Sequence, residues 1–91
     1  MAPTALVTIN LEGWPPPLIE IHALIAALPK RHADSPDVPP NASQHVNELV
    51  VAFPFTSVAR LPDHTYAGQV AERALASIYD GAFDVQRVRI S

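Results

Sequence analysis

The sequence contains no cysteine, only three glycines and a single lysine, and each shortage excludes a class of function. Without cysteine the chain has no disulfide framework, no thiolate metal site and no cysteine nucleophile. The glycines stand alone at positions 13, 68 and 81, which excludes a glycine-rich loop that cradles phosphate. No apolar run reaches the roughly 18 residues of a membrane-spanning helix.

Charge and composition narrow the partners and the architecture. The net charge is −3, whereas nucleic-acid binding needs clustered Lys and Arg that replace counterions. We therefore expect no nucleic-acid partner. Residues 1–7 lack the basic start and long apolar run of a secretory signal, so we expect a soluble, cytoplasmic protein without a membrane partner. The 91 residues, 48% of them hydrophobic, predict one globular domain spanning 1–91.

Two segments alternate with the period of a β-strand. Thr4–Leu11 places every second residue on one apolar face, and Asn47–Phe55 does the same. The proposed core residues are Ala5, Val7, Ile9, Leu11, Leu49, Val51, Phe53 and Phe55. Pro54 cannot donate a ladder hydrogen bond, so the second segment is predicted to be an edge strand or to break there.

The first predicted helix, Leu18–Leu28, is apolar nearly all round, with only Glu20 and His22 polar. It follows a turn over Glu12–Pro17 that leads into the helix, because proline is tolerated in the first helical turn, and Pro29 ends it. The prolines are alternatively a polyproline ligand for an aromatic groove. A small domain cannot surround such a helix, which favours a second copy or a partner protein on its outer face.

The second predicted helix, Asp63–Gly81, is amphipathic, with Asp63 as the N-cap and Gly81 as the left-handed terminating residue. Its apolar stripe is Ala67, Val70, Ala71, Ala74, Leu75 and Ile78. Phe83–Ile90 is predicted to be a strand whose apolar phase changes midway. A bulge near Gln86 would turn both halves toward the core and send Asp84, Arg87 and Arg89 to the open face.

Residues 30–45 are rich in Pro, Asp, Ser and Asn and show no apolar period. They are predicted to form a long irregular loop, which serves either as a spacer or in binding. The element order then resembles the ferredoxin-like, split β-α-β layout of an α+β two-layer sandwich, with two helices on one face of a three- or four-stranded sheet. Its second strand would be short, irregular or missing. A fully parallel β-α-β-α-β sheet is the competing topology.

No residue pattern indicates a cofactor or a metal. The histidines at 22, 32, 45 and 64 lack the spacing that places two ligands on one helix face. His22 is a candidate general base or pH-sensitive interface group, or simply a histidine bonded to a backbone carbonyl. Arg60, Arg87 and Arg89 can hold an acidic group of a partner or solubilise the open face. Trp14 is either an interface anchor or a plug of the core.

The sequence therefore predicts a non-enzymatic protein–protein interaction or assembly module, analogous to small virus-encoded inhibitors or structural components. The partner is expected to be the chain itself or another protein. The interface candidates are Trp14, Ile21, His22, Ile25, Arg60, Arg87 and Arg89. The semi-apolar open face, with Leu6, Val50 and Ala52, adds to this prediction. The alternative is a cofactor-free dimeric enzyme, resembling small ferredoxin-like monooxygenases, with a pocket between sheet and helices that is lined by Asn10, His22, Tyr66 and Tyr79.

Overall fold

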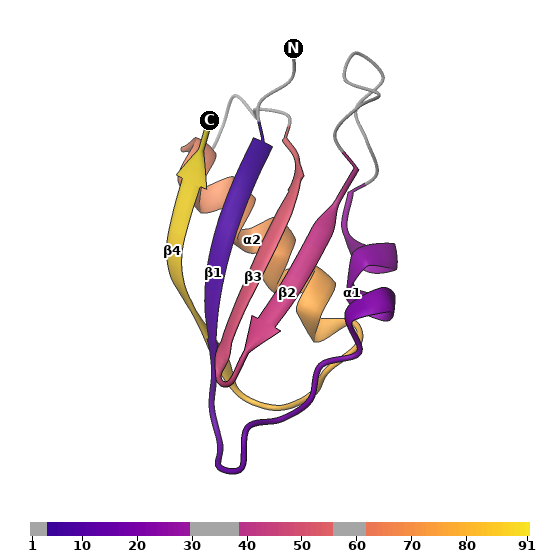
Figure 1. Ribbon diagram of the computed structural model, residues 1–91. Helices are drawn as coiled ribbons and strands as arrows, with labels where there is room; N and C mark the ends of the chain where they lie inside the picture. The colour runs from indigo at the N-terminus through magenta and orange to yellow at the C-terminus, as the bar shows by residue number, and fades with distance from the viewer. Residues whose placement is uncertain (1–3, 30–38, 56–61) are drawn as a thin grey trace.

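The computed structural model describes residues 4–29, 39–55 and 62–91, which form a four-stranded antiparallel sheet with two helices behind it (Figure 1). The elements in chain order are β1 Thr4–Leu11, α1 Ile21–Ala27, β2 Asn41–His45, β3 Glu48–Pro54, α2 Asp63–Ala76 and β4 Phe83–Ile90. The strand order is β2-β3-β1-β4. The predicted α+β class is confirmed, and the parallel alternative is wrong, because every neighbouring pair is antiparallel.

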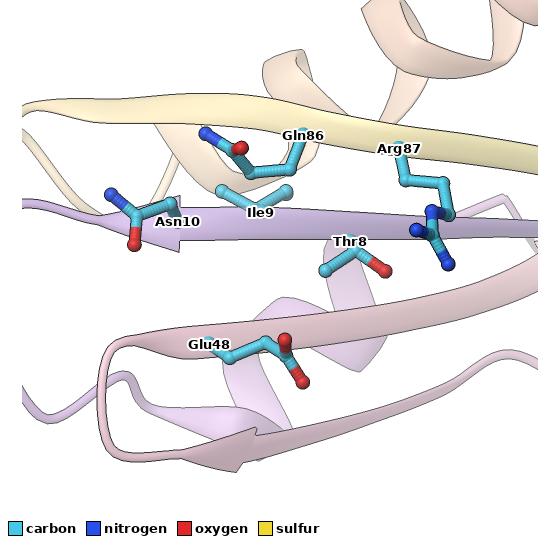
Figure 2. A pocket seen from close by; sticks show the side chains of 6 residues that line it. All are labelled: Thr8, Ile9, Asn10, Glu48, Gln86 and Arg87. Atoms are coloured by element: carbon cyan, nitrogen blue, oxygen red, sulfur yellow. The ribbon is translucent and has the colours of Figure 1, made fainter.

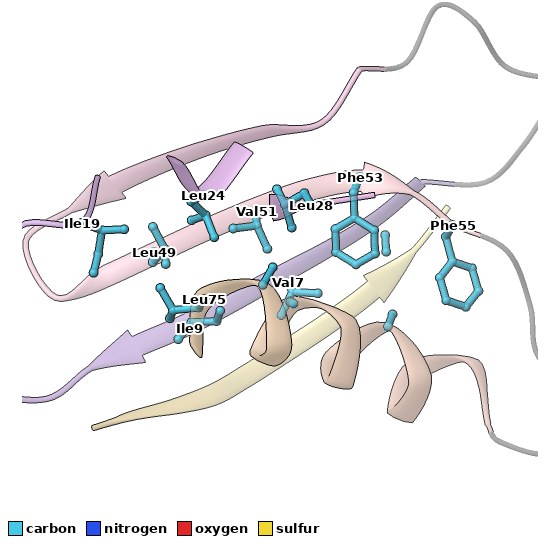
Figure 3. Packing of buried hydrophobic residues seen from close by; sticks show 14 of the residues in the cluster. Val7, Ile9, Ile19, Leu24, Leu28, Leu49, Val51, Phe53, Phe55 and Leu75 are labelled. Carbon is cyan, nitrogen blue, oxygen red and sulfur yellow. The ribbon is translucent and has the colours of Figure 1, made fainter. Parts of the chain in front are cut away.

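The core lies between the sheet and the helices, where β1 and β3 contribute every second residue (Figure 3). All eight core residues predicted for these strands are at most 3% exposed. Alternation produces this result because successive side chains of a strand point to opposite faces. Leu24 of α1 and Leu75 of α2, both fully buried, close the core from the helix side.

β2 occupies the end of the segment that was predicted to be an irregular loop. It pairs with β3 through a two-residue turn, Val46–Asn47, in the register Asn41↔Ala52 to His45↔Glu48. Only Ala42 and Gln44 face the helices, and neither is fully buried. A polar strand with so small an inner face has no apolar period, so the sequence pattern missed it. Residues 30–38 of the predicted loop lie outside the described residues.

β3 is an interior strand, so the prediction of an edge strand at Pro54 is wrong, whereas the alternative, a strand that breaks at Pro54, agrees with the end of β3 at this residue. Thr4 of β1 lies opposite Pro54 of β3. Both backbone hydrogen bonds of Thr4 go to Ser91, on the other side of β1. The nitrogen of Pro54 therefore points toward the β2 side. The pairing of β2 with β3 ends at Ala52. Proline thus occupies a position where no ladder bond is needed.

α1 begins three residues later than predicted, at Ile21 rather than Leu18. Glu20 is extended, and the backbone of Pro17 and Ile19 is hydrogen-bonded to the side chain of Gln44. These bonds replace the first helical turn, so the prolines do not start the helix. It ends at Ala27, one residue before the predicted Leu28, which is extended as expected of a residue before Pro29.

α2 carries the predicted stripe except for Ile78, which lies beyond its last residue, and both of its ends differ from the prediction. The N-cap position is Pro62, with Asp63 as the first helical residue, and the helix ends at Ala76. Gly81 does not have a positive φ, so it is not the left-handed terminator. It lies instead under the ring of Tyr79, where an added Cβ would collide with the tyrosine hydroxyl. Gly68, absent from the predicted stripe, is buried against Val85 and Val88.

β4 contains the predicted bulge. Its register against β1 shifts between Arg87, opposite Thr8, and Val85, opposite Ile9, which leaves Gln86 as the extra residue. Because of this shift, both apolar halves of the strand pack against the core while Asp84, Arg87 and Arg89 are exposed.

Candidate functional site

The residues predicted to form an interface do not lie on one surface. The predicted set is Trp14, Ile21, His22, Ile25, Arg60, Arg87 and Arg89. Trp14 lies in the segment between β1 and α1, and it is 81% exposed, so it does not plug the core. On α1 the histidine is exposed and both isoleucines are half-buried. The two arginines of β4 are exposed on the open face, and Arg60 lies outside the described residues.

A second set of exposed apolar residues gathers where the β2–β3 hairpin meets the segment before α1. Leu18 is 93% exposed and Val46 is 53% exposed, and with Pro16 and Gln44 they line a shallow depression of about 310 Å³. Trp14 belongs to the same segment. We call Trp14, Pro16, Leu18 and Val46 the hairpin-end patch. Among the described residues, the one other large hydrophobic side chain classed as exposed is Leu6, at 36%.

The side-chain amide of Gln44 ties the segment that carries Leu18 to the hairpin. Its Oε1 accepts from the backbone N–H of Ile19 at 3.0 Å. Its Nε2 donates to the carbonyl of Pro17 at 2.6 Å and to that of Val46 at 2.9 Å. One side chain therefore fixes the backbone on both sides of Leu18 and the backbone of the hairpin turn.

Asn47 fixes the other end of this segment. Its Nδ2 donates to the carbonyls of Leu11, at 2.8 Å, and Gly13, at 3.0 Å. Its backbone carbonyl accepts from the N–H of Leu11 at 2.7 Å. The hairpin-end patch is thus carried on backbone held by two amide side chains, which lowers the entropy lost when a partner binds.

Val46 has a backbone conformation that its side chain disfavours. Its φ is +57°, in the left-handed region, at the first position of a two-residue hairpin turn. Turns of this length favour glycine or asparagine at such a position, and a β-branched residue there is a genuine outlier. The chain therefore keeps an exposed valine at a cost of about 1–3 kcal/mol of local strain.

Acidic residues are neighbours in the sequence of the segments that carry the hairpin-end patch. Glu12 and Glu20 flank its segment, and Glu48 follows the turn, all of them exposed. Sequence analysis missed Leu18 and Val46 because the apolar pattern placed Leu18 in a helix and Val46 just before a strand. One local feature could have indicated Val46: it precedes Asn47 at a position where a two-residue hairpin turn favours glycine or asparagine.

The open face of the sheet carries a polar hollow of about 690 Å³ beside the bulge. Figure 2 shows Glu48 and Arg87 on opposite sides of Thr8, with Asn10 and Gln86 beyond. Leu6 from the predicted semi-apolar face lies in the row next to it, between Ala52 and Arg89.

The four residues considered for an enzymatic pocket are not brought together. Tyr66 packs against Phe55 with ring centroids 5.7 Å apart, near the start of α2, and Tyr79 packs against Phe83 at 6.5 Å, beyond its end. Asn10 lies on the open face and His22 is exposed on α1. Over residues 4–29, 39–55 and 62–91, no group of three His, Cys, Asp or Glu residues is placed to hold a metal ion.

Comparison with known proteins gives no family: no family model matches the chain, and no curated protein or solved structure shows significant similarity to it. Within the described ranges, neither helix has the length and apolar character needed to cross a membrane.

Proposed function

We propose that this chain is a small non-enzymatic protein–protein interaction or assembly module that docks through the hairpin-end patch. The observation that carries the proposal is that the exposed side chains of Leu18 and Val46 line one shallow depression, and that Trp14, four residues before Leu18, is exposed as well. Among the residues that the structure describes, these three are the most exposed of the large hydrophobic ones. Exposed hydrophobic residues are ordinary when scattered singly, but gathered on one site they are typical of docking surfaces.

The energetics support docking over chance exposure. Burying a leucine or valine side chain contributes roughly 1.5–3 kcal/mol, and a tryptophan adds the kind of anchor found at interface centres. The bonds from Gln44 and Asn47 hold the backbone in place before any partner arrives. The strain at Val46 supports the proposal as well, since strained residues cluster at functional sites.

The partner surface is expected to be apolar with a basic rim. The exposed Glu12 and Glu20 lie just before and just after the segment that carries Trp14, Pro16 and Leu18, and rim charges of opposite sign steer association and set specificity. We propose a partner protein that presents an apolar pocket flanked by Lys or Arg.

Site-specific photocrosslinking tests the proposal. A benzophenone amino acid replaces Leu18 in one sample and the exposed Glu72 of α2 in a matched control, and both are irradiated in lysate of the source cells. We expect an adduct from position 18 alone, with the crosslinked peptide apolar and next to Lys or Arg. Trp14→Ser and Val46→Ser should abolish the adduct, and Leu6→Ser on the open face should not. Equal adducts from both positions, or adducts insensitive to these variants, would overturn the proposal.

We also propose that the fold is the ferredoxin-like arrangement. In support, β1 and β2, joined through α1, flank β3, while β3 and β4, joined through α2, flank β1. An inserted antiparallel strand of this kind characterises a split β-α-β unit. Nuclear Overhauser effects between Ser43 and Val50 would test the β2 position, and their absence would contradict it.

A further inference from the structure

β4 forms the one long outer edge among the described strands. No described element lies beyond it (Figure 1). The opposite edge, β2, is shorter and is preceded by two prolines. β4 spans eight residues without proline or glycine. Among the usual devices that protect an edge strand from pairing, β4 has only its bulge and its charged side chains.

The backbone groups that face this outer edge follow from the pairing with β1. Residues of an antiparallel strand alternately bond to the neighbour on one side and face the other side. Ser91 exchanges both bonds with Thr4, and the carbonyl of Ala82 accepts from the N–H of Glu12. Counting inward from these two ends, the N–H and C=O groups that point away from β1 belong to Phe83, Val85, Val88 and Ile90.

The bulge makes β4 symmetric about its own centre. Phe83 and Val85 before the bulge, and Val88 and Ile90 after it, all face the helix side. Asp84 before it and Arg89 after it face the open side. Reversing the strand about the bulge therefore superposes apolar residues on apolar residues, and it places the acidic residue on a basic one.

We propose that β4 pairs antiparallel with β4 of a second copy, about a two-fold axis at the bulge. Phe83 then faces Ile90 of the other copy and Val85 faces Val88. All four residues carry outward-pointing backbone groups, so these are hydrogen-bonded pairs. Asp84 faces Arg89 in the pair type without backbone bonds, where side chains approach most closely, so the opposite charges stabilise the contact.

Only this register places side chains of the same sheet face opposite one another on both sides of the bulge. A shift by one residue opposes side chains from different faces. A shift by two moves the axis off the bulge, so one half still matches while residues next to the bulge meet partners from the wrong face. A regular strand of another protein likewise matches only one half. Because of the bulge, β4 of a second copy matches β4 along its whole length and a regular strand does not. Pairing of the two copies makes one sheet that runs through both.

Charge reversal combined with mixing tests this interface. We expect wild type to weigh twice the 9.8 kDa of the chain by light scattering at high concentration. Asp84→Arg alone places an arginine opposite Arg89, and Arg89→Asp alone places an aspartate opposite Asp84. The two-fold axis repeats each like-charged pair, so either variant should raise the dimer dissociation constant about 10- to 30-fold. The double variant should restore it. The two single variants should combine when mixed, because each supplies the charge that the other lacks.

Circular dichroism and melting of each variant verify that the monomer remains folded, and Arg73→Asp on the exposed side of α2 is the control for charge change. A wild type that stays monomeric would overturn the proposal. Single variants that still self-associate, or that fail to combine with each other, would also overturn it. The inference stands independently of the hairpin-end patch: the photocrosslink from position 18 reports on that patch alone, so either result can fail without the other.

Discussion

The side-chain amide of Gln44 donates a 2.6 Å hydrogen bond to the backbone carbonyl of Pro17, which lies 27 residues earlier in the chain. Three hydrogen bonds in all link this side chain to the segment before α1 and to the hairpin turn. This one residue thereby replaces the first turn of the expected helix with an extended segment, and it leaves Leu18 facing solvent.

Gln44→Ala should lower the free energy of unfolding by about 1–3 kcal/mol, because partly buried backbone groups of Pro17 and Ile19 lose their partners. Urea denaturation followed by circular dichroism measures the change. Ser43→Ala, one residue away on the exposed face of β2, is the control and should change stability by less than about 0.5 kcal/mol. A Gln44 variant as stable as this control would show that the hydrogen bonds do not hold the segment.

Comparing Val46→Gly with Val46→Ala separates the backbone strain at this position from the contact that its side chain makes with a partner. Both remove the exposed apolar side chain, but only glycine is relaxed at a φ of +57°. The glycine variant should therefore be more stable than the alanine variant by about 1–2 kcal/mol, and more stable than wild type. Both should lose the crosslink from position 18. Equal stability of the two variants would contradict a strained turn.

Gly68→Ala should stabilise the protein. An added Cβ would lie 3.5 Å from Cγ2 of Val88, which is ordinary contact, and alanine is favoured over glycine within a helix by about 0.5–1 kcal/mol. A rise of several degrees in the melting temperature is expected for a domain of this size. Gly81→Ala should have the opposite effect, because its Cβ collides with the Tyr79 ring. A fall in melting temperature for Gly68→Ala would indicate that the α2–β4 contact is tighter than described.

Truncating side chains of α1 should lower stability more, the more deeply the side chain is buried. Leu24 is fully buried, so Leu24→Ala should cost about 2–5 kcal/mol of stability. Ile25→Ala, on a half-buried neighbour, should cost clearly less. Ile25→Asp tests the original hypothesis that this helix forms an interface: loss of a complex with little loss of stability would support it. A stability loss matching that of Leu24→Ala would make the helix plain core.

The strands β1 and β3 were predictable because each carries an apolar face with strict alternation. β4 alternates on either side of a phase change, and that phase change located its bulge. The stripe of α2 was predictable from its period for the same reason. β2 was not predictable, since polar residues such as Asn41 and Ser43 form a strand only when β3 supplies the partner. The start of α1 was missed because apolar residues and tolerated prolines extended the helical pattern past Ile21.

The sequence by itself determined which side chains of β1, β3, β4 and α2 face the core, because alternation and helical period depend only on the order of residues along the chain. The tertiary structure decided which apolar residues stay outside. Leu18 is exposed because a glutamine 26 positions later bonds the backbone around it. The shared face of Asp84 and Arg89, by contrast, was predictable from the phase change of the apolar pattern, and the structure added the register of β4 against β1. The exposure of Leu18 depends on a contact between distant segments, which no local pattern encodes.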